Sequence, residues 1–365
     1  MTGRHEMVYE VPAHQKAVEQ GRLRTLGYPP ASIVSVRTGR ITLEFRSYPG
    51  SVAIPLRDHG PQPKLRNIGA VYDRDGALVV DSQRAVRMRS WRNNPPVRSG
   101  PVAGSASTEP MLLTGRSFFA GHYSPGFGHV LLETLARFWR PEDYGAYDQI
   151  VCYRRRADVA FADIDLLSTL LGCLGASASQ LLLLPDSEVR FETLDVSTSP
   201  FVLKWMADPR FLDAFERIAR CVSPPAQRSA TPARVYLSRS RLGRGRRATN
   251  EAQIESLMIA NGFSVEHPQE LPFARQVELM SGADVIAGCD GSALHLAVFA
   301  RAGTRLLAID SRQVPSQFVI DRVRGLDALH VLALDEGTAS RVALWEADID
   351  RVERGLEVLL GTATG

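Results

Sequence analysis

The stretch Asp284–Ala300, DVIAGCDGSALHLAVFA, joins two apolar runs through small and polar residues. The first run is short and contains β-branched residues, which predicts a buried strand, and the second has the composition of a helix. Small residues between a strand and a helix form either a tight turn or a phosphate site, because unpaired helical N–H groups favour an anion. The rest of the sequence has to distinguish these alternatives.

Strand and helix patterns alternate on both sides of this stretch. We expect strands at residues 234–238, 263–267, 284–288 and 304–310, with helices at 250–262, 271–282 and 292–303. Asn250 is expected to cap the first of these helices and Gly262 to end it. A second alternation of the same kind covers residues 111–222. Alternation at this length predicts βαβ units and therefore an α/β fold with two Rossmann-like domains.

Segments rich in Pro, Gly, Ser and Ala at 94–110 and 223–233 separate these regions. Before the first segment, short β-like runs surround an Asp75-Gly76 hairpin signal. We therefore expect a β-rich N-terminal segment at 1–105, an N-terminal Rossmann-like domain at 106–228 and a C-terminal one at 229–340. A helix is expected in the final segment, 341–365.

Composition excludes several classes of protein. The 365 residues are 44% hydrophobic, and 43 basic against 40 acidic residues leave a net charge of +3, which does not favour nucleic acid. The four cysteines form no CxxC pair, so neither a zinc site nor a disulfide framework is expected, and a reducing cytoplasm is the simplest compartment. The most apolar region, 164–184, is interrupted by polar residues, so no transmembrane segment is expected and any association with the inner face of a membrane would be peripheral.

Four motifs resemble glycosyltransferase family 61, which occurs in capsular polysaccharide proteins and eukaryotic O-linked transferases. They are GFGHVLLETLARFW at 126–139, YLSRSR at 236–241, NEAQIESLMIANGFSVEHPQELPFARQ at 250–276 and GCDGSAL at 288–294. The resemblance implies a GT-B-like architecture, in which two Rossmann-like domains face a cleft. It also implies an inverting transferase that needs no metal and no further cofactor, and that moves a sugar from a nucleoside diphosphate, with UDP preferred, to a glycan or lipid-linked acceptor in surface polysaccharide biosynthesis.

The resemblance also assigns donor-binding residues to the C-terminal domain. An arginine after a strand suits a diphosphate, because a guanidinium can bind two phosphate oxygens. Glu251 and Gln276 face either the donor pocket or, as ordinary helix residues, the first turn and solvent. The residues expected to bind the donor are Ser238, Arg239, Arg241, Glu251, Gln276, Gly288, Gly291 and Ser292.

His129 and Glu133 carry the expected catalytic chemistry. They are four residues apart and therefore lie on one face of a helix. A histidine oriented by a carboxylate suits the base that takes the proton of an acceptor hydroxyl. Asp290 is the second candidate for the base, although hydroxyl binding or capping fits it better, and it departs from the residues common in the family. His122 is a third candidate, and His295 is expected to support the core.

Two other functions remain open at the level of sequence. A glycan-binding or scaffold protein could keep the fold without turnover, and Asp290 is the feature that supports this alternative. A nucleotide-dependent oxidoreductase is disfavoured, because no GxGxxG follows a strand. The two Asp-x-Asp sequences, at 73–75 and 348–350, are expected to be surface features.

Overall fold

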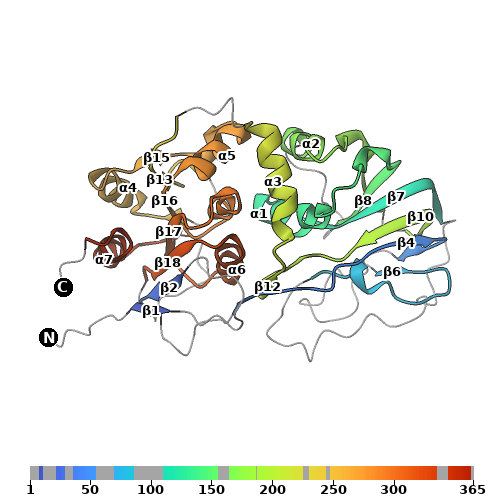
Figure 1. Ribbon diagram of the computed structural model, residues 1–365, viewed down its shortest axis with the longest axis horizontal. Helices are drawn as coiled ribbons and strands as arrows, with labels where there is room; N and C mark the ends of the chain where they lie inside the picture. The colour runs from blue at the N-terminus through green and yellow to red at the C-terminus, as the bar shows by residue number, and fades with distance from the viewer. Residues whose placement is uncertain are drawn as a thin grey trace. The chain divides into compact units, whose positions relative to one another are not determined.

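The computed structural model describes residues 8–10, 22–28, 36–54, 70–85, 110–154, 164–185, 187–224, 230–243, 247–334 and 344–362 (Figure 1). The described residues form two compact units. Unit 1 comprises Met1–Gly39, Lys204–Pro209 and Ala219–Gly365, and unit 2 comprises Arg40–Leu203 and Arg210–Ile218. Strands from the first hundred residues are thus divided between two units.

Unit 1 contains a seven-stranded sheet in the order β15-β13-β16-β17-β18-β2-β1. All neighbouring pairs are parallel except β1 with β2. The strands are β1 (Val8–Glu10), β2 (Leu23–Leu26), β13 (Arg234–Leu237), β15 (Ser264–Glu266), β16 (Val285–Cys289), β17 (Arg305–Asp310) and β18 (Asp327–Leu332). Counted from β13, the C-terminal strands follow the order 2-1-3-4-5 of a doubly wound sheet. The strand order therefore reverses between β13 and β16, and ligands of such sheets bind outside the carboxyl ends of the strands at that point.

The helices of unit 1 alternate with these strands as the sequence predicts. They are α4 (Glu251–Ala260), η9 (Pro268–Glu270), α5 (Phe273–Gly282), η10 (Leu294–Phe299), α6 (Pro315–Arg324) and α7 (Ile349–Leu360). Short pairs join β3 (Arg37–Thr38) to β12 (Met206–Ala207) and β14 (Arg247–Ala248) to β19 (Leu344–Trp345).

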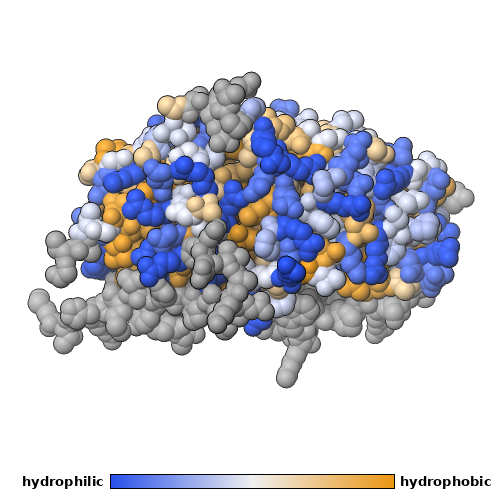
Figure 2. Space-filling view, viewed as in Figure 1, coloured by the Kyte–Doolittle hydropathy of each residue, from blue (hydrophilic) through white to orange (hydrophobic). Residues whose placement is uncertain are grey.

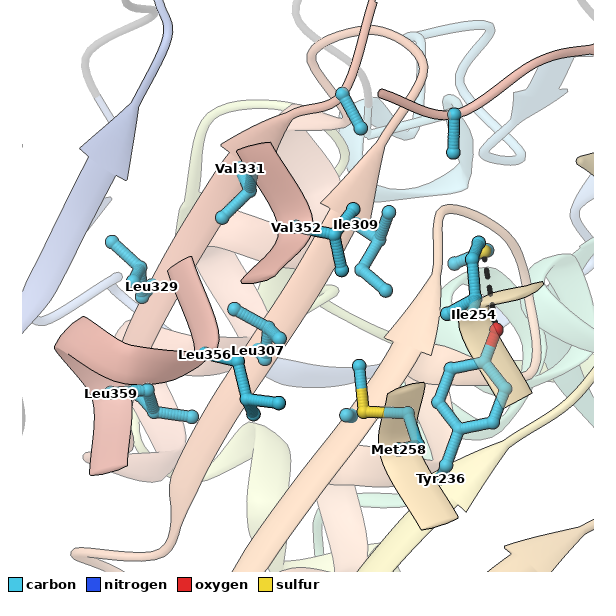
Figure 3. Packing of buried hydrophobic residues seen from close by; sticks show 14 of the residues in the cluster. Tyr236, Ile254, Met258, Leu307, Ile309, Leu329, Val331, Val352, Leu356 and Leu359 are labelled. Atoms are coloured by element: carbon cyan, nitrogen blue, oxygen red, sulfur yellow. Dashed lines mark hydrogen bonds between the residues drawn. The ribbon is translucent and has the colours of Figure 1, made fainter. Parts of the chain in front are cut away.

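The C-terminal helix α7 packs on the sheet of unit 1 (Figure 3). Val352, Leu356 and Leu359 project from it into the core that contains Leu307 and Val331. Each such side chain stabilises the fold by about 1.5–3 kcal/mol when fully buried. Gly355 allows the close approach, because a Cβ there would lie 2.4 Å from Val331 Cγ2.

Unit 2 is built on a second sheet in the order β6-β5-β10-β7-β8-β9, with β4 also paired to β10. Strands β7, β8, β9 and β10 pair in parallel, whereas β4 and β5 run antiparallel to β10. Its strands are β4 (Phe45–Pro49), β5 (Val52–Ile54), β6 (Ala70–Tyr72), β7 (Met111–Tyr123), β8 (Gln149–Arg154), β9 (Leu181–Leu183) and β10 (Val189–Ser197). The short strand β11 (Phe201–Val202) is not part of this sheet. The predicted α/β class is confirmed by these two sheets and their helices.

The helices assigned wholly or mainly to unit 2 follow the predicted pattern with one irregular run. They are η2 (Val80–Ser82), α1 (Phe127–His129), η4 (Val130–Thr134), η5 (Leu135–Phe138), η6 (Tyr144–Ala146), α2 (Ile164–Gly172), η7 (Ala178–Gln180) and α3 (Phe211–Val222). The predicted helix after Gly126 is present, but it passes from α through a π segment, η4, into a 3₁₀ segment, η5.

Three local predictions are wrong and one is confirmed. The helix expected at 292–303 is only the six-residue 3₁₀ helix η10. Asn250 does not cap α4, because its side chain instead bonds the backbone of Ala347. Cys173 and Cys221 are disulfide-bonded, so cysteine usage no longer favours a reducing compartment. The turn at Asp75-Gly76 is present, and Gly76 takes a φ of +81°.

In the described part of the chain, no helix combines the length and the apolar composition needed to cross a membrane. Figure 2 shows hydrophilic and hydrophobic residues interspersed over the face in view.

Candidate functional site

Two turns meet at the carboxyl ends of β13 and β16 in unit 1. Leu237, the last residue of β13, pairs with Gly288 of β16. Arg239 follows the first strand and Gly291 the second, so both lie where the strand order reverses. This is the position at which an open α/β sheet binds a ligand.

The guanidinium of Arg239 lies against Gly291. A Cβ built on Gly291 would be 1.6 Å from Arg239 Nη1, and the φ of Gly291 is +154°. Glycine is therefore needed at this position both for space and for backbone conformation.

Arg239 is only 7% exposed, and none of the described residues accepts a hydrogen bond from its guanidinium. Its Nε is buried without a hydrogen-bond partner, and no described residue forms an ion pair with the guanidinium. A buried cation without hydrogen-bond acceptors is costly unless a ligand supplies them. An anionic ligand at this turn would supply such acceptors.

Glu251 binds the backbone of this turn. Its Oε1 accepts hydrogen bonds from the Arg239 backbone N–H at 2.5 Å and from the Tyr236 hydroxyl at 3.1 Å. Burial raises the pKa of Glu251, and the hydrogen bonds from Arg239 and Tyr236 oppose that shift. Glu251 thereby positions the backbone of Arg239, whichever ligand binds.

Three of the expected donor-binding side chains contact protein groups. Ser238 is buried and donates to Glu255 Oε1 at 2.5 Å, and Arg241 forms an exposed ion pair with Glu270. Gln276 donates to the backbone carbonyls of Pro268 and Leu271 at 2.8 and 2.9 Å. These side chains support their own loops and helices in this structure.

The remaining expected residues lie in the turn after β16. Gly288 leaves space for Leu294, because a Cβ would be 3.3 Å from its Cδ1. Asp290 is buried, and its Oδ2 accepts a hydrogen bond from the Ser311 hydroxyl at 2.9 Å. Ser292 is exposed, and its carbonyl accepts the N–H of His295. The turn thus brings Asp290 and Gly291 to the same strand end as Arg239.

Unit 2 brings His129 and Glu133 together as the spacing predicts. His129 Nδ1 lies 2.5 Å from Glu133 Oε1, and the His129 side chain is 42% exposed. Arg84 donates to both oxygens of Glu133, with Nη2 at 2.9 Å from Oε1. The π segment η4 that contains Glu133 is a type of irregularity that often occurs at functional sites.

The charge of Glu133 is fixed by these partners. Burial alone would raise the pKa of Glu133, but the hydrogen bonds from Arg84 and His129 lower it to about 2. Glu133 is therefore a carboxylate at neutral pH, and it orients His129 with Nδ1–H toward it. Nε2 is then the basic nitrogen of the ring.

A small pocket lies beside this pair. It is lined by Arg84, His122, Leu132 and Glu133 among others, and it has room for about one water molecule. His122 is buried and stacks on Tyr153, with ring centroids 5.5 Å apart. The half-exposed His129 is thus the more accessible of the two histidines.

Arg84 is a functional candidate that sequence reasoning missed. It lies 49 residues before Glu133 and belongs to no motif. Its role depends on a tertiary contact, and a single sequence gives no signal for such a contact.

The aspartates of the two Asp-x-Asp sequences, at 73–75 and 348–350, have local structural roles. Asp73 Oδ1 accepts the backbone N–H groups of Asp75 and Ala77 in the hairpin turn, and Asp348 caps α7. Within the described ranges, no group of three His, Cys, Asp or Glu side chains is arranged to hold a metal ion.

The sequence is similar to a known protein family. A family model described as Glycosyltransferase 61 matches residues 127–307. The matched residues begin at the helical run of His129 and Glu133 and end in β17, so they include Arg239 and Gly291 but not Arg84. No curated protein matches the sequence.

Proposed function

Because the chain belongs to the glycosyltransferase 61 family and is a glycosyltransferase, we propose that its donor is a nucleoside diphosphate sugar, with UDP as the nucleotide. The acceptor is a hydroxyl group of a glycan or of a lipid-linked saccharide. Assembly of a surface polysaccharide is the proposed setting.

The observation that carries this proposal is the buried guanidinium of Arg239, whose Nε has no hydrogen-bond partner among the described residues. A diphosphate supplies several anionic oxygens in the geometry that a guanidinium binds best. Its charge would offset the desolvation of Arg239, and Gly291 leaves the space that such a group needs.

The proposed reaction is a single displacement with inversion. The acceptor oxygen forms a bond to the anomeric carbon while the bond from that carbon to the diphosphate oxygen breaks. The acceptor proton passes to Nε2 of His129, and the negative charge of Glu133 stabilises the imidazolium that results. Arg239 stabilises the charge that develops on the leaving diphosphate, which is the role a metal ion has in other transferases.

The two clusters belong to different units, so this mechanism requires both units to act on one pair of substrates. A GT-B-like organisation, with the donor bound by unit 1 and the acceptor by unit 2, is part of the proposal. The residues that match the family model lie in both units.

Release of UDP from UDP-sugars tests the proposal. The purified chain is supplied with a panel of UDP-sugars and glycan acceptors in the presence of a chelator, and compared with His129→Gln. We expect turnover in the intact chain and a loss of about 10²–10⁴-fold in kcat in the variant, with donor affinity retained. An α-linked donor should give a β-linked product.

Two results would change the assignment. Donor binding without turnover on any acceptor or water would favour a glycan-binding or scaffold protein that keeps the donor site. Full activity in His129→Gln would exclude His129 as the catalytic base, and Asp290 and His122 would then be the candidates.

A further inference from the structure

Arg84 follows the short helix η2 and contacts the His129–Glu133 pair of unit 2 from a distant part of the chain. Its guanidinium binds both carboxylate oxygens of Glu133: Nη2 lies 2.9 Å from Oε1, and Nε donates to Oε2. Oε1 also lies 2.5 Å from Nδ1 of His129. Two parallel hydrogen bonds fix the plane of a carboxylate, which a single donor does not do. Arg84 therefore holds Oε1 toward the histidine.

The backbone on both sides of Arg84 is bonded to other parts of unit 2. The carbonyl of Gln83 accepts a hydrogen bond from Nη2 of Arg137 at 3.3 Å. The carbonyl of Ala85 accepts one from the backbone N–H of Leu203 at 3.0 Å. The Arg84 side chain itself is only 19% exposed. The guanidinium is therefore supplied by an anchored segment rather than by a side chain that moves freely at the surface.

The charge of Arg84 acts on the affinity of the pair for a proton. A buried carboxylate raises the affinity of a neighbouring imidazole for a proton, and a cation bound to the same carboxylate opposes that effect. Arg84 and His129 both contact Oε1 of Glu133, so the guanidinium is close enough to act strongly. Without this cation, the pair would keep its proton to a higher pH, whichever of the two members carries it.

Other ionisable groups surround the pair. Arg137 of η5 donates to backbone carbonyls, and burial lowers its pKa to about 10, so it stays charged at neutral pH. Asp81 of η2 opposes that shift. His122 of β7 lines the same small pocket as Glu133. Arg84 thus supplies a cation that contacts the Glu133 carboxylate directly, whereas the hydrogen bonds of Arg137 go to the backbone.

We propose that Arg84 is a positioning residue: through Glu133 it holds His129 with Nδ1–H toward the carboxylate, and it lowers the pH at which the pair releases its proton. A cation held on this carboxylate extends the pH range in which Nε2 can take the proton of an acceptor hydroxyl. The role of His129 as the base rests on the proposed function, whereas the effect of Arg84 on the titration of the pair does not.

The titration is measured first, by NMR of the histidine-labelled full chain without ligand, and His129→Gln identifies the His129 signals. Arg84→Gln removes the charge and leaves an amide that can donate to one carboxylate oxygen. We expect its His129 midpoint to lie about one pH unit above that of the intact chain. Arg84→Lys keeps a cation, so its midpoint should stay within about half a unit of that of the intact chain.

Arg190→Gln is the matched control, because it removes the same charge from an exposed ion pair with Glu188 in unit 2. It should leave the His129 midpoint unchanged, since salt and water screen exposed charges. Equal midpoints in the intact chain and in folded Arg84→Gln would overturn the proposal, as would a lower midpoint in the variant.

A second pair of variants covers the case in which Arg84→Gln does not fold. Removing Arg84 leaves the buried Glu133 carboxylate without its charged partner, which is strongly destabilising. Glu133→Gln, alone and combined with Arg84→Gln, contains no such carboxylate. We expect the double variant to titrate about one pH unit above Glu133→Gln, because the cation is the charge that differs between them. Equal midpoints in these two variants would overturn the proposal.

The consequence for catalysis is tested with the pH dependence of sugar transfer. We expect the acidic limb of the kcat profile to move up by about one pH unit in Arg84→Gln and to stay in place in Arg84→Lys, with the KM for the donor unchanged. In both variants the plateau of kcat should fall about tenfold, because neither side chain holds the carboxylate by two parallel hydrogen bonds.

An acidic limb that stays in place while the His129 midpoint moves would overturn the catalytic part of the proposal, as would an unchanged plateau in both variants. If the intact chain transfers no sugar, the proposed function fails and the catalytic part fails with it. The NMR titration still decides whether Arg84 acts on the pair, so the two failures are distinguishable.

Discussion

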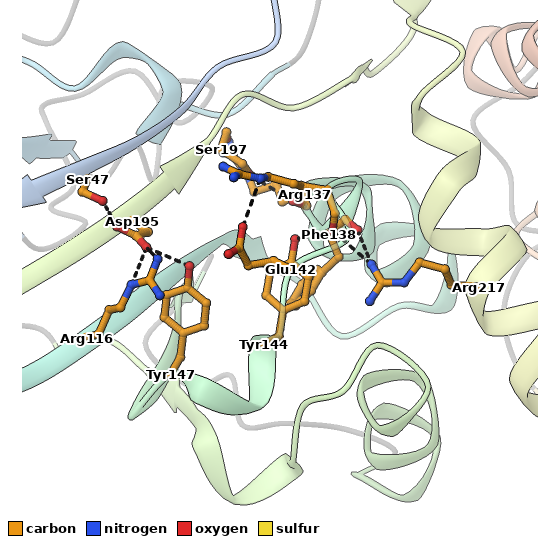
Figure 4. Close-up of polar contacts among 11 residues, drawn as sticks. Ser47, Arg116, Arg137, Phe138, Glu142, Tyr144, Tyr147, Asp195, Ser197 and Arg217 are labelled. Carbon is orange, nitrogen blue, oxygen red and sulfur yellow. Dashed lines mark hydrogen bonds and ion pairs between the residues drawn. The ribbon is translucent and has the colours of Figure 1, made fainter.

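The two units each bury an arginine, and the two arginines differ in what accepts their hydrogen bonds. Arg137 in unit 2 is 2% exposed and donates to the carbonyl of Ser197 (Figure 4). It also donates to the carbonyl of Gln83, and its guanidinium lies 5.2 Å from the Phe119 ring centroid. Arg239 in unit 1 is 7% exposed, and none of the described residues accepts a hydrogen bond from its guanidinium. The protein supplies hydrogen-bond acceptors to the first cation, whereas we propose that a ligand supplies them to the second.

Because of this difference, replacing Arg137 and replacing Arg239 should change stability and ligand binding in different ways. A buried cation with protein acceptors contributes to stability, because its loss leaves those acceptors buried and unsatisfied. A buried cation without acceptors costs stability in the free protein, and its contribution appears only on binding. The predictions below follow from this contrast.

The largest expected effect is on the stability of unit 2. Arg137→Met should lower the free energy of unfolding by about 2–4 kcal/mol, because two backbone carbonyls lose a charged donor. Denaturant unfolding measures the change. Arg190→Met, which removes an exposed ion pair with Glu188, is the control and should change stability by less than about 1 kcal/mol. Equal effects of the two substitutions would show that the hydrogen bonds of Arg137 do not stabilise the fold.

His330 is a buried side chain with protein hydrogen-bond partners, as Arg137 is, but it can lose its proton. The carboxylates of Asp310 and Asp321 outweigh burial and raise the pKa of His330 to about 9. Because this pKa lies above the unfolded value of about 6.5, the stabilisation is fully present below about pH 6.5 and is lost as the pH rises through 9.

The expected loss is roughly 3 kcal/mol between these limits. It is measured as the difference between the intact chain and His330→Gln in urea unfolding at a series of pH values. NMR titration of His330 checks the same pKa directly if the variant does not fold. A His330 that loses its proton near pH 6.5 would show that the two carboxylates do not satisfy it.

Gly291→Ala tests the space beside Arg239. The new Cβ would lie 1.6 Å from Nη1 at a φ of +154°, so the guanidinium has to move. We expect UDP affinity to fall about tenfold, or about 1.4 kcal/mol. Gly243→Ala is the control, since no atom lies within 4 Å of the Cβ it would add. An unchanged UDP affinity in Gly291→Ala would show that Arg239 does not bind the ligand.

The smallest expected effect is on the stability of the free protein when Arg239 itself is replaced. Arg239→Met should leave the free energy of unfolding within about 0.5 kcal/mol of the intact value or raise it, because a buried unpaired cation is removed. Thermal unfolding without ligand measures this. A loss as large as that of Arg137→Met would mean that the protein satisfies both arginines.

The sequence predicts the βα alternation of residues 234–310 well, because each strand and helix there has a strong local pattern. Gly262 ends α4 as expected, with a φ of +76°. The helix after Ser292 could not be judged correctly from composition, because its apolar residues fit both a long α-helix and the short 3₁₀ turn that forms.

The candidate site was predictable only where its residues share a local motif. His129 and Glu133 are neighbours on one helix, so their spacing reveals the pair. Arg84 and the His330 cluster are assembled from distant segments, and nothing local marks them. The division of the first hundred residues between two sheets is likewise a matter of strand pairing over long distances.

The central claim is that Arg239 is the anion-binding cation of the donor site. The most direct test is calorimetric titration of UDP, with GDP, CMP and NAD as controls, into the intact chain, Arg239→Met and Arg137→Met without added metal. The account predicts selective UDP binding that is lost by about 100-fold or more in Arg239→Met and retained in folded Arg137→Met. Equal UDP affinity in the intact chain and Arg239→Met, or no nucleotide binding at all, would contradict it.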